Sequence, residues 1–209
     1  MPVVFETNKE NRSFLSVWKI KETEKQLAEL LSFTDLMRNQ LKLISNPEKR
    51  LEWLASRLLI QRLTGLPPCV SHTSSGKPNL NKSDLNVTIS HTKGFATVLV
   101  STQICGVDME YPSPRISKLS ERFVNPTEEK FISGRDEPTY HAVIWCAKET
   151  LYKTAGIQGI IFKDQMLIDP FLPEKSGTLS GRILFEDSPC QVYDLSYKIT
   201  DEYYLVWHW

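Results

Sequence analysis

The spacing of apolar residues predicts two long helices, one in each half of the chain. For the first helix, Asn46 supplies an N-cap, Pro47 fits the first turn and Gly65 ends the helix, and leucines between them form one apolar stripe. The second helix runs over residues 140–155 and is followed by Gly156 as a C-cap. Because the second helix is apolar for most of its length, we expect it to be well buried.

Short runs rich in β-branched and aromatic residues predict strands around these helices. The predicted strands cover residues 14–20, 87–91, 95–101, 104–110, 181–185, 190–199 and 203–209. A capping box of Thr23 and Gln26 predicts a helix that ends near Phe33. Residues 117–131 favour a helix or a helix-turn-helix broken near 125–127, and residues 66–86 are expected to be mostly loop.

The run from Ile104 to Glu110 carries an informative pair of acids. Alternate side chains of a strand share a face, so Asp108 and Glu110 lie with Gly106 on one face, and the opposite face is apolar. The two acidic Cα atoms are then about 6.5–7 Å apart, close enough for both carboxylates to reach one cation. Two explanations stay open: a magnesium site built from hard oxygen ligands, or a strand end whose acids face water.

Glu149 raises a similar question on the second long helix. It lies four residues before Lys153, a spacing that usually makes a surface salt bridge, and four residues after Trp145. Its neighbours at 142–147 are almost all apolar, however, so an acid at this position needs a partner or a function.

Several basic residues could bind phosphate. Arg50 and Arg57 lie on one side of the first long helix, which fits either a solvated edge or a basic rim over a phosphate. Gly76-Lys77-Pro78 leaves backbone N–H groups accessible beside a lysine, which suits an anion but also an ordinary turn. His91, beside Ser90 at a strand end, is on its own more often structural than functional.

Composition narrows the class of protein. With 25 basic and 25 acidic residues in 209, the formal net charge is zero, so no overall field favours nucleic acid or an anionic membrane. No apolar run reaches membrane-spanning length, and the first residues lack the features of a signal peptide. The four cysteines have no metal-ligand spacing, which predicts reduced thiols in a cytoplasmic protein.

Taken in order, these segments resemble the motifs of the 4′-phosphopantetheinyl transferases, in the long monomeric form that activates peptide and fatty synthases. Gly76-Lys77-Pro78 resembles the family's glycine-lysine-proline segment, and residues 106–110 resemble its Gly-Val/Ile-Asp-x-Glu strand. Residues 145–150 resemble its Trp-x-x-Lys-Glu-Ala helix, with Lys153 at the further lysine. Arg122-Phe123 with Thr127-Glu128 resembles the segment between these two motifs. Thr150 departs from the usual alanine, and the Gly156–Gly159 loop is one residue longer than usual.

The resemblance implies an α+β fold of two similar lobes related by a pseudo-twofold axis, each a small antiparallel sheet packed with a long helix. The lobes would cover residues 1–103 and 104–209, with coenzyme A between them. It also implies a cytoplasmic, monomeric enzyme that moves the 4′-phosphopantetheine group of coenzyme A onto a serine of an apo acyl or peptidyl carrier protein. The reaction would depend on magnesium and release adenosine 3′,5′-bisphosphate.

The resemblance assigns roles to individual residues as well. Magnesium would be held on the pyrophosphate by Asp108, Glu110 and Glu149. The catalytic residues would be Glu149, Lys153 and Glu128, with either Glu128 or Lys153 as the base for the serine. Coenzyme A would be bound by Arg50, Arg57, Lys77, Ser90, His91, Lys148 and Lys153.

Two other classes of protein stay open, a magnesium-dependent phosphohydrolase acting on a pyrophosphate like that of coenzyme A and a non-catalytic module that binds carrier proteins. Arg115, Lys118 and Arg122 fall at helical spacing on one face, which fits either a solvated surface or a docking face for an acidic carrier protein.

Overall fold

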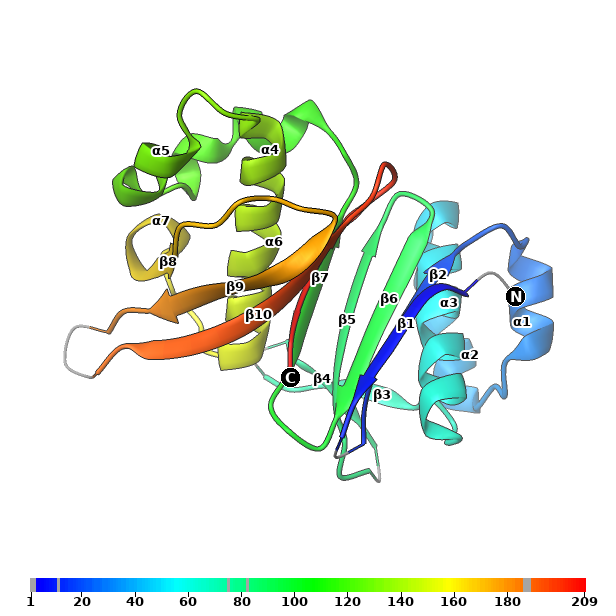
Figure 1. Cartoon of the computed structure of the whole chain (residues 1–209). Coiled ribbons are helices and arrows are strands. Elements are labelled where there is room, and N and C mark those ends of the chain that lie inside the picture. Colours follow the sequence, from blue (N-terminus) through cyan, green and yellow to red (C-terminus); the bar gives the residue numbers. More distant parts are fainter. Residues whose placement is uncertain (1–2, 11, 75, 82, 186–188) are drawn as a thin grey trace. The chain divides into compact units, whose positions relative to one another are not determined.

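The structure, a computed structural model, describes residues 3–10, 12–74, 76–81, 83–185 and 189–209. The chain divides into two compact units. Unit 1 comprises Met1–Cys105 together with Trp209, and unit 2 comprises Gly106–His208. Each unit contains an antiparallel sheet with a long helix packed on it, which confirms the predicted α+β class (Figure 1).

Unit 1 is built on an antiparallel sheet with the strand order β1-β2-β6-β5-β4-β3. Its strands are β1 (Val3–Lys9), β2 (Ser13–Lys19), β3 (Val70–His72), β4 (Pro78–Leu80), β5 (Asn86–Thr92) and β6 (Phe95–Ser101). β6 lies inside the sheet, and all of its residues are buried. The strands predicted at residues 87–91 and 95–101 are confirmed as β5 and β6, which pair directly as a hairpin with Thr92 opposite Phe95.

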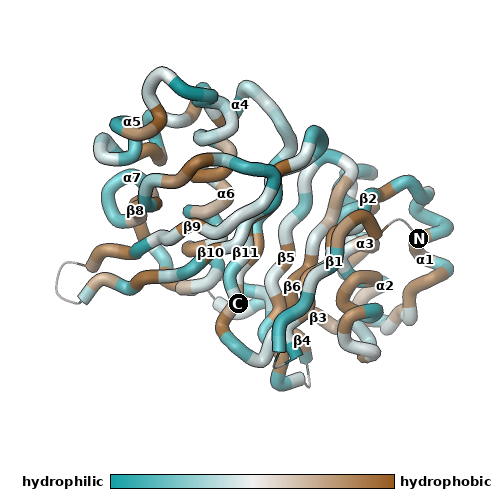
Figure 2. The backbone as a smooth tube through the Cα atoms, in the orientation of Figure 1, coloured by the Kyte–Doolittle hydropathy of each residue, from teal (hydrophilic) through white to brown (hydrophobic). Residues whose placement is uncertain are grey.

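The helices of unit 1 start at side-chain caps, and α1 packs on α3. They are α1 (Glu24–Leu30), α2 (Asp35–Lys42) and α3 (Pro47–Thr64). Thr23, Thr34 and Asn46 each accept a hydrogen bond from the backbone N–H three residues later. Gly65 ends α3 with a φ of 68°, which glycine adopts without strain. α3 packs on β6 and β2, and brown, apolar segments recur along α3, β5 and β6 in Figure 2.

Unit 2 is built on a second antiparallel sheet, with the order β7-β11-β10-β9-β8. Its strands are β7 (Gly106–Glu110), β8 (Met166–Ile168), β9 (Ser176–Ile183), β10 (Gln191–Ile199) and β11 (Tyr204–His208). Among the described residues, this order places β7, the strand with the acidic pair, at one edge of the sheet. The predicted strands are confirmed at β7, β10 and β11, whereas β9 begins earlier in the chain than predicted.

Helix α6 (Glu137–Ala155) runs along one face of this sheet and packs against all five of its strands (Figure 1). As predicted, Gly156 caps it, with a φ of 65°. The shorter elements of unit 2 are α4 (Pro114–Lys118), the 3-10 helix η1 (Ser120–Arg122), α5 (Pro126–Ile132) and α7 (Phe162–Gln165). α4 packs on α6, and the apolar residues of these elements form one core with the sheet.

The sequence did not predict β1, α2 or β8, because none of them carries a long apolar pattern. β1 alternates between half-buried and exposed positions at a sheet edge, α2 buries only Met37 and Leu41, and β8 has three residues. The stretch expected to be one helix or a helix-turn-helix is broken twice. α4 ends at Lys118 and Arg122 belongs to η1, so the basic residues expected on one helix face do not share a helix.

Within the described ranges, no helix has both the length and the apolar character needed to cross a lipid bilayer.

Candidate active site

Gly106 brings strand β7 into direct contact with α6. A Cβ atom on Gly106 would lie 2.2 Å from Oγ1 of Thr154 and 2.5 Å from the carbonyl oxygen of Thr150, so only glycine fits at this position. Gly106 therefore faces α6. Because side chains alternate along a strand, Asp108 and Glu110 share the face of Gly106 and therefore also face α6.

An ion pair joins Asp108 to α6. Nζ of Lys153 lies 2.7 Å from Oδ1 of Asp108 and also donates to the carbonyl oxygen of Val107 at 3.1 Å. Asp108 is only 6% exposed, and it also accepts a hydrogen bond from the fully buried thiol of Cys146. Two donors from α6 thus stabilise the carboxylate where water is largely excluded.

Glu149 completes an acidic cluster with Asp108 and Glu110. Burial, the charge of Asp108 and, to a smaller extent, the charge of Glu110 together raise the pKa of Glu149 to about 7, and Lys153 opposes this rise. Since such effects need charges that lie close by, the three predicted acids share one electrostatic environment. Three carboxylates face one ammonium group, which leaves an excess of negative charge.

The acidic cluster has the ligand chemistry of a magnesium site. Carboxylate oxygens are the hard ligands that Mg²⁺ prefers, and a divalent cation would neutralise the charges of Asp108 and Glu110, which add to the effect of burial on the pKa of Glu149. As the side chains lie, no three acidic, histidine or cysteine residues in the described part of the chain are grouped closely enough to hold a metal ion. Asp108 contacts Lys153 instead. The residues therefore fit the ion chemically, and binding requires their side chains to turn toward it.

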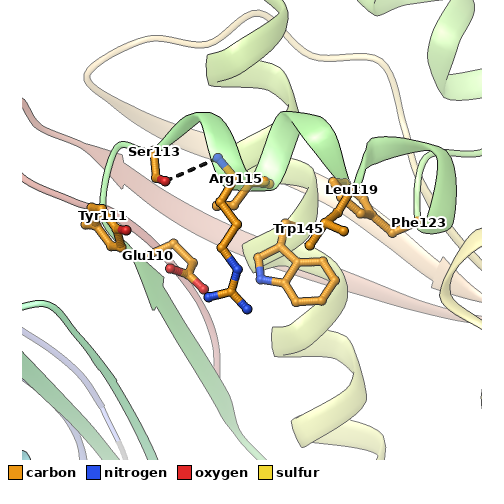
Figure 3. Close-up of a pocket in the computed structure, with 8 residues that line it drawn as sticks. Glu110, Tyr111, Ser113, Arg115, Leu119, Phe123 and Trp145 are labelled. Atoms are coloured by element: carbon orange, nitrogen blue, oxygen red, sulfur yellow. Dashed lines mark hydrogen bonds between the residues drawn. The ribbon is translucent and has the colours of Figure 1, made fainter.

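A pocket opens beside Glu110 at the end of β7 (Figure 3). Its volume is about 40 Å³, which is room for about three water-sized groups. The lining residues are Glu110, Tyr111, Ser113, Arg115, Ile116, Leu119, Phe123 and Trp145. In Figure 3 the guanidinium group of Arg115 points toward the carboxylate of Glu110, and the indole of Trp145 lies next to it. Arg115 thus lines a pocket with an apolar wall and a charged rim.

Lys148 and Glu128 form an ion pair whose side chains are 0% and 1% exposed. Nζ of Lys148 donates to Oε2 of Glu128 at 2.8 Å, to the carbonyl oxygen of Phe123 at 2.6 Å and to that of Phe162 at 3.1 Å. An ammonium group has three protons, so all three are used. Burial lowers the pKa of Lys148, and Glu128 opposes this effect. Lys148 therefore has no donor left for a phosphate, contrary to the role expected for it.

Glu128 is equally occupied. In addition to Lys148 it accepts the backbone N–H of Asn125 at 2.7 Å and that of Ile168 at 2.8 Å, each on a different carboxylate oxygen. Neither oxygen is accessible to a substrate serine or to a water molecule that could relay its proton, because the side chain is almost fully buried. The contacts of Glu128 favour a structural role over the expected role as a base.

In unit 1, Arg50 links three helices. Its Nε and Nη2 atoms bind the two carboxylate oxygens of Glu24, and Nη1 donates to the carbonyl oxygens of Leu41 and Ile44 at 2.6 and 3.0 Å. The hydrogen bonds from Arg50 lower the pKa of Glu24. Four of the five N–H groups of the guanidinium are therefore used within the fold, which leaves little of it for coenzyme A.

Arg57 differs from Arg50, although both were expected to bind phosphate. Its guanidinium lies over the ring of Trp53 at 4.5 Å, and Nη1 donates to Oγ of Ser56 at 3.1 Å. The residue is 5% exposed, its Nε makes no hydrogen bond within the described structure, and burial lowers its pKa to about 10. A buried cation with an unused donor is suited to binding an anion.

His91 belongs to a charged cluster on α3 and β5. Its Nδ1 lies 3.1 Å from Oε2 of Glu52 and 3.4 Å from Nζ of Lys49, which is itself 2.8 Å from Glu52. Ser90, the neighbour of His91, is 7% exposed. Lys49 and Glu52 were not among the site residues predicted from the sequence. Their i,i+3 spacing on a predicted helix was the available signal, but nothing in the sequence places His91 beside them.

Lys77 lies in the turn between β3 and β4. Its backbone N–H donates to Oγ1 of Thr73 at 3.1 Å, and the N–H of Thr73 donates to the carbonyl oxygen of Lys77 at 2.9 Å. Burial raises the pKa of the Cys105 thiol to about 12, and the positive charge of Lys77 partly offsets this rise. The side chain of Lys77 therefore lies within electrostatic reach of Cys105. The segment expected to bind an anion is thus a hydrogen-bonded turn that presents one lysine.

Comparison with known protein families found a match for the segment that carries the acidic cluster. Residues 104–204 match the family model of the 4′-phosphopantetheinyl transferase superfamily. The chain thus carries a 4′-phosphopantetheinyl transferase superfamily domain, as its motifs predicted. No curated protein matches the sequence.

The superfamily domain includes most of the features described for unit 2. The acidic cluster, Lys153, the pocket beside Glu110 and the Lys148–Glu128 pair all lie within the matched range. The basic residues of unit 1 lie outside it. Sequence reasoning missed Cys146, because a cysteine in an apolar helix gives no sign of a hydrogen bond to Asp108.

Proposed function

We propose that this protein transfers the 4′-phosphopantetheine group of coenzyme A to a serine of an apo acyl or peptidyl carrier protein and releases adenosine 3′,5′-bisphosphate. The observation that carries this proposal is the cluster of Asp108, Glu110 and Glu149 beside Lys153, within a 4′-phosphopantetheinyl transferase superfamily domain. This combination of acids and a lysine suits the transfer of a phosphoryl group, in which catalysis is mainly positioning and neutralisation of charge.

In this reaction the serine oxygen attacks the phosphorus that carries pantetheine. A new bond forms between that oxygen and phosphorus, and the bond from phosphorus to the bridging oxygen breaks. The electron pair of the broken bond stays with adenosine 3′,5′-bisphosphate. The serine proton must pass to a base, and we assign Glu149 to this role because it is a half-buried carboxylate of the cluster whereas Glu128 is fully occupied.

We propose that Asp108, Glu110 and Glu149 hold Mg²⁺, which when bound neutralises charge on the pyrophosphate. Lys153 would bind the transferring phosphoryl group. Its ammonium group is already fixed near Asp108 by two hydrogen bonds, so it can offer a charged donor with little loss of side-chain freedom.

For the phosphates of coenzyme A we propose Arg57, Lys77, Ser90 and His91, and we add Lys49 because it lies beside His91. Arg57 has an unused buried donor, and the backbone of Lys77 is held by a hydrogen bond to Thr73. Arg50 and Lys148 are left out of this set, because their donors are used within the fold. The pocket beside Glu110 suits a short segment of the pantetheine arm, an uncharged chain with amide groups, because it combines an apolar wall with a polar rim.

We propose that the enzyme acts as a cytoplasmic monomer on an acidic carrier protein. Lys118 and Arg122 are exposed on unit 2 and would attract such a partner, although they do not share a helix. The four cysteines are free thiols, which fits a reducing compartment.

Intact-mass measurement of a carrier protein tests the function. The purified protein is incubated with coenzyme A, Mg²⁺ and an apo carrier protein, with an EDTA-treated sample and the Asp108→Asn variant as controls. We expect the carrier to gain the mass of one phosphopantetheine group and an equal amount of adenosine 3′,5′-bisphosphate to appear, with neither product in the controls. Cleavage of coenzyme A without a change in the carrier would indicate a phosphohydrolase, and a folded protein that does neither would indicate a binding module.

A further inference from the structure

The ammonium group of Lys148 connects segments on both sides of α6 in the sequence. Its three hydrogen bonds reach the carbonyl oxygen of Phe123, which follows η1, that of Phe162 at the start of α7, and Glu128 in α5. Glu128 extends the network to the N–H groups of Asn125 and of Ile168 in β8. One buried ion pair thus fixes the main chain at four places outside α6.

Stability alone does not account for such a pair. Removing two charges from water costs several kcal/mol per ion, and apolar residues of similar volume often give a protein of equal or greater stability. What an apolar pair would lose is the directional hold on the main chain, since the carbonyl and N–H groups that it now binds would be left without partners.

The two carbonyl groups held by Lys148 belong to residues whose rings pack on Trp145. The ring centroid of Phe123 lies 5.2 Å from that of Trp145, and the centroid of Phe162 lies 5.7 Å from it. Phe123 and Trp145 both line the pocket beside Glu110. We call these three aromatic residues the aromatic wall. The main-chain positions of its two phenylalanines, and hence the rings around Trp145, depend on the donors of Lys148.

We propose that the Lys148–Glu128 pair positions the aromatic wall and thereby sets the affinity of the pocket beside Glu110 for the pantetheine arm of coenzyme A. The identity of this ligand rests on the proposed function, whereas the positioning itself rests on the contacts above. Neither residue touches the substrate. Loss of the pair is therefore expected to raise KM for coenzyme A more than it lowers kcat, because the acidic cluster and Lys153 stay in place.

The main variant is Lys148→Met combined with Glu128→Leu, which leaves no uncompensated buried charge. Lys163→Met is the matched control, because Lys163 also donates to a backbone carbonyl, that of Glu121 at 3.0 Å, but does so in an exposed position. Both proteins are labelled with 5-fluorotryptophan, and the Trp145 resonance is assigned with a Trp145→Phe variant. The remaining tryptophans of the chain serve as internal references in the ¹⁹F NMR spectra.

In the double variant we expect the Trp145 resonance to shift or broaden, KM for coenzyme A to rise about tenfold and kcat to stay within about threefold of wild type. In Lys163→Met all three should be unchanged. A double variant with an unchanged Trp145 resonance and an unchanged KM would overturn the proposal. If it does not fold, Glu128→Gln decides in its place, with the same shift of Trp145 expected in smaller measure and an unmoved resonance as the contrary result. Should wild type lack transferase activity, the proposed function fails, and the NMR comparison still decides whether the pair positions the wall.

Discussion

Replacement of Gly106 by alanine tests how the acidic cluster is positioned. The added methyl group would lie 2.2 Å from Oγ1 of Thr154 and 2.5 Å from the carbonyl oxygen of Thr150, whereas ordinary contacts begin at 3.4 Å. A side chain such as that of Thr154 can turn away, but a carbonyl group within a helix cannot. Since packed interiors have no spare space, β7 has to move away from α6 by about 1 Å.

This displacement carries Asp108 and Glu110 with the strand. Overpacking of this kind destabilises a fold by about 1–3 kcal/mol, and misplacing reacting groups by about 1 Å can lower a rate about 100-fold. We therefore expect kcat/KM for carrier loading to fall about 100-fold in Gly106→Ala. The assay is the intact mass of the carrier protein over time, with thermal unfolding measured on the same preparation.

Gly94→Ala is the control for a loss of stability alone. Gly94 has a φ of 78°, and nothing lies within 4 Å of an added Cβ atom, so alanine there is strained by about 1–2 kcal/mol without displacing a neighbour. Its transferase activity should match wild type below the melting temperature. In Gly106→Ala with Thr154→Ala, the carbonyl contact remains, so activity should return only in part. If Gly106→Ala loses stability like Gly94→Ala and keeps full activity, the close approach of β7 to α6 does not position the cluster.

Three other changes separate the roles of charged residues. Asp108→Asn should abolish magnesium-dependent carrier loading and change the melting temperature little, because the relief of repulsion within the acidic cluster offsets the lost ion pair and Lys153, whose side chain is 27% exposed, can reach water. Turnover near wild type would refute the metal assignment. Arg57→Gln should raise KM for coenzyme A about tenfold, whereas Arg50→Gln should lower the melting temperature and leave KM unchanged, and equal effects on KM would contradict this distinction. Burial lowers the pKa of His141 below its ordinary 6.5, and nearby glutamates oppose this. Because the unfolded chain then binds the proton first, the stability tied to neutral His141 is complete above about pH 6.5 and is lost as the pH falls toward the lower native pKa. The melting temperature of His141→Gln should therefore fall less steeply than that of wild type between about pH 7 and pH 5, and equal slopes would show that His141 is not involved.

The elements that the sequence predicted well are those with local signals. The cap at Asn46 and the stop at Gly65 defined α3, and Gly156 defined the end of α6, because capping depends on residues within one turn. Strand β1 was missed because an edge strand needs only a half-buried face, and its apolar positions become meaningful only when β2 pairs with it.

The candidate site also has parts that local patterns predict and parts that they do not. The shared face of Asp108 and Glu110 follows from strand periodicity, and the face toward α6 follows from Gly106. The pocket beside Glu110 could not be predicted, because its lining combines Arg115 and Trp145, which meet only after α4 packs on α6. Tertiary packing, which no local pattern encodes, decides such contacts.

The bonding capacity of each cation separates residues that look alike in the sequence. Lys148 and Lys153 lie five residues apart on one helix, and the family motif includes both, but Lys148 spends its three protons on protein acceptors in full burial while Lys153 donates to two acceptors at a partly exposed position. The number of hydrogen-bond donors in use also separates the two arginines. Arg50 uses four of its donors within the fold, whereas Nε of Arg57 makes no hydrogen bond within the described residues. A motif indicates which type of side chain stands at a position. The hydrogen bonds that this side chain makes within the fold then determine whether it can also bind a substrate. Arg57 on this ground, and Lys153 because its side chain is 27% exposed beside the acidic cluster, are the cations to test first for phosphate binding. Lys148 and Arg50 are the residues whose loss should alter the fold around them.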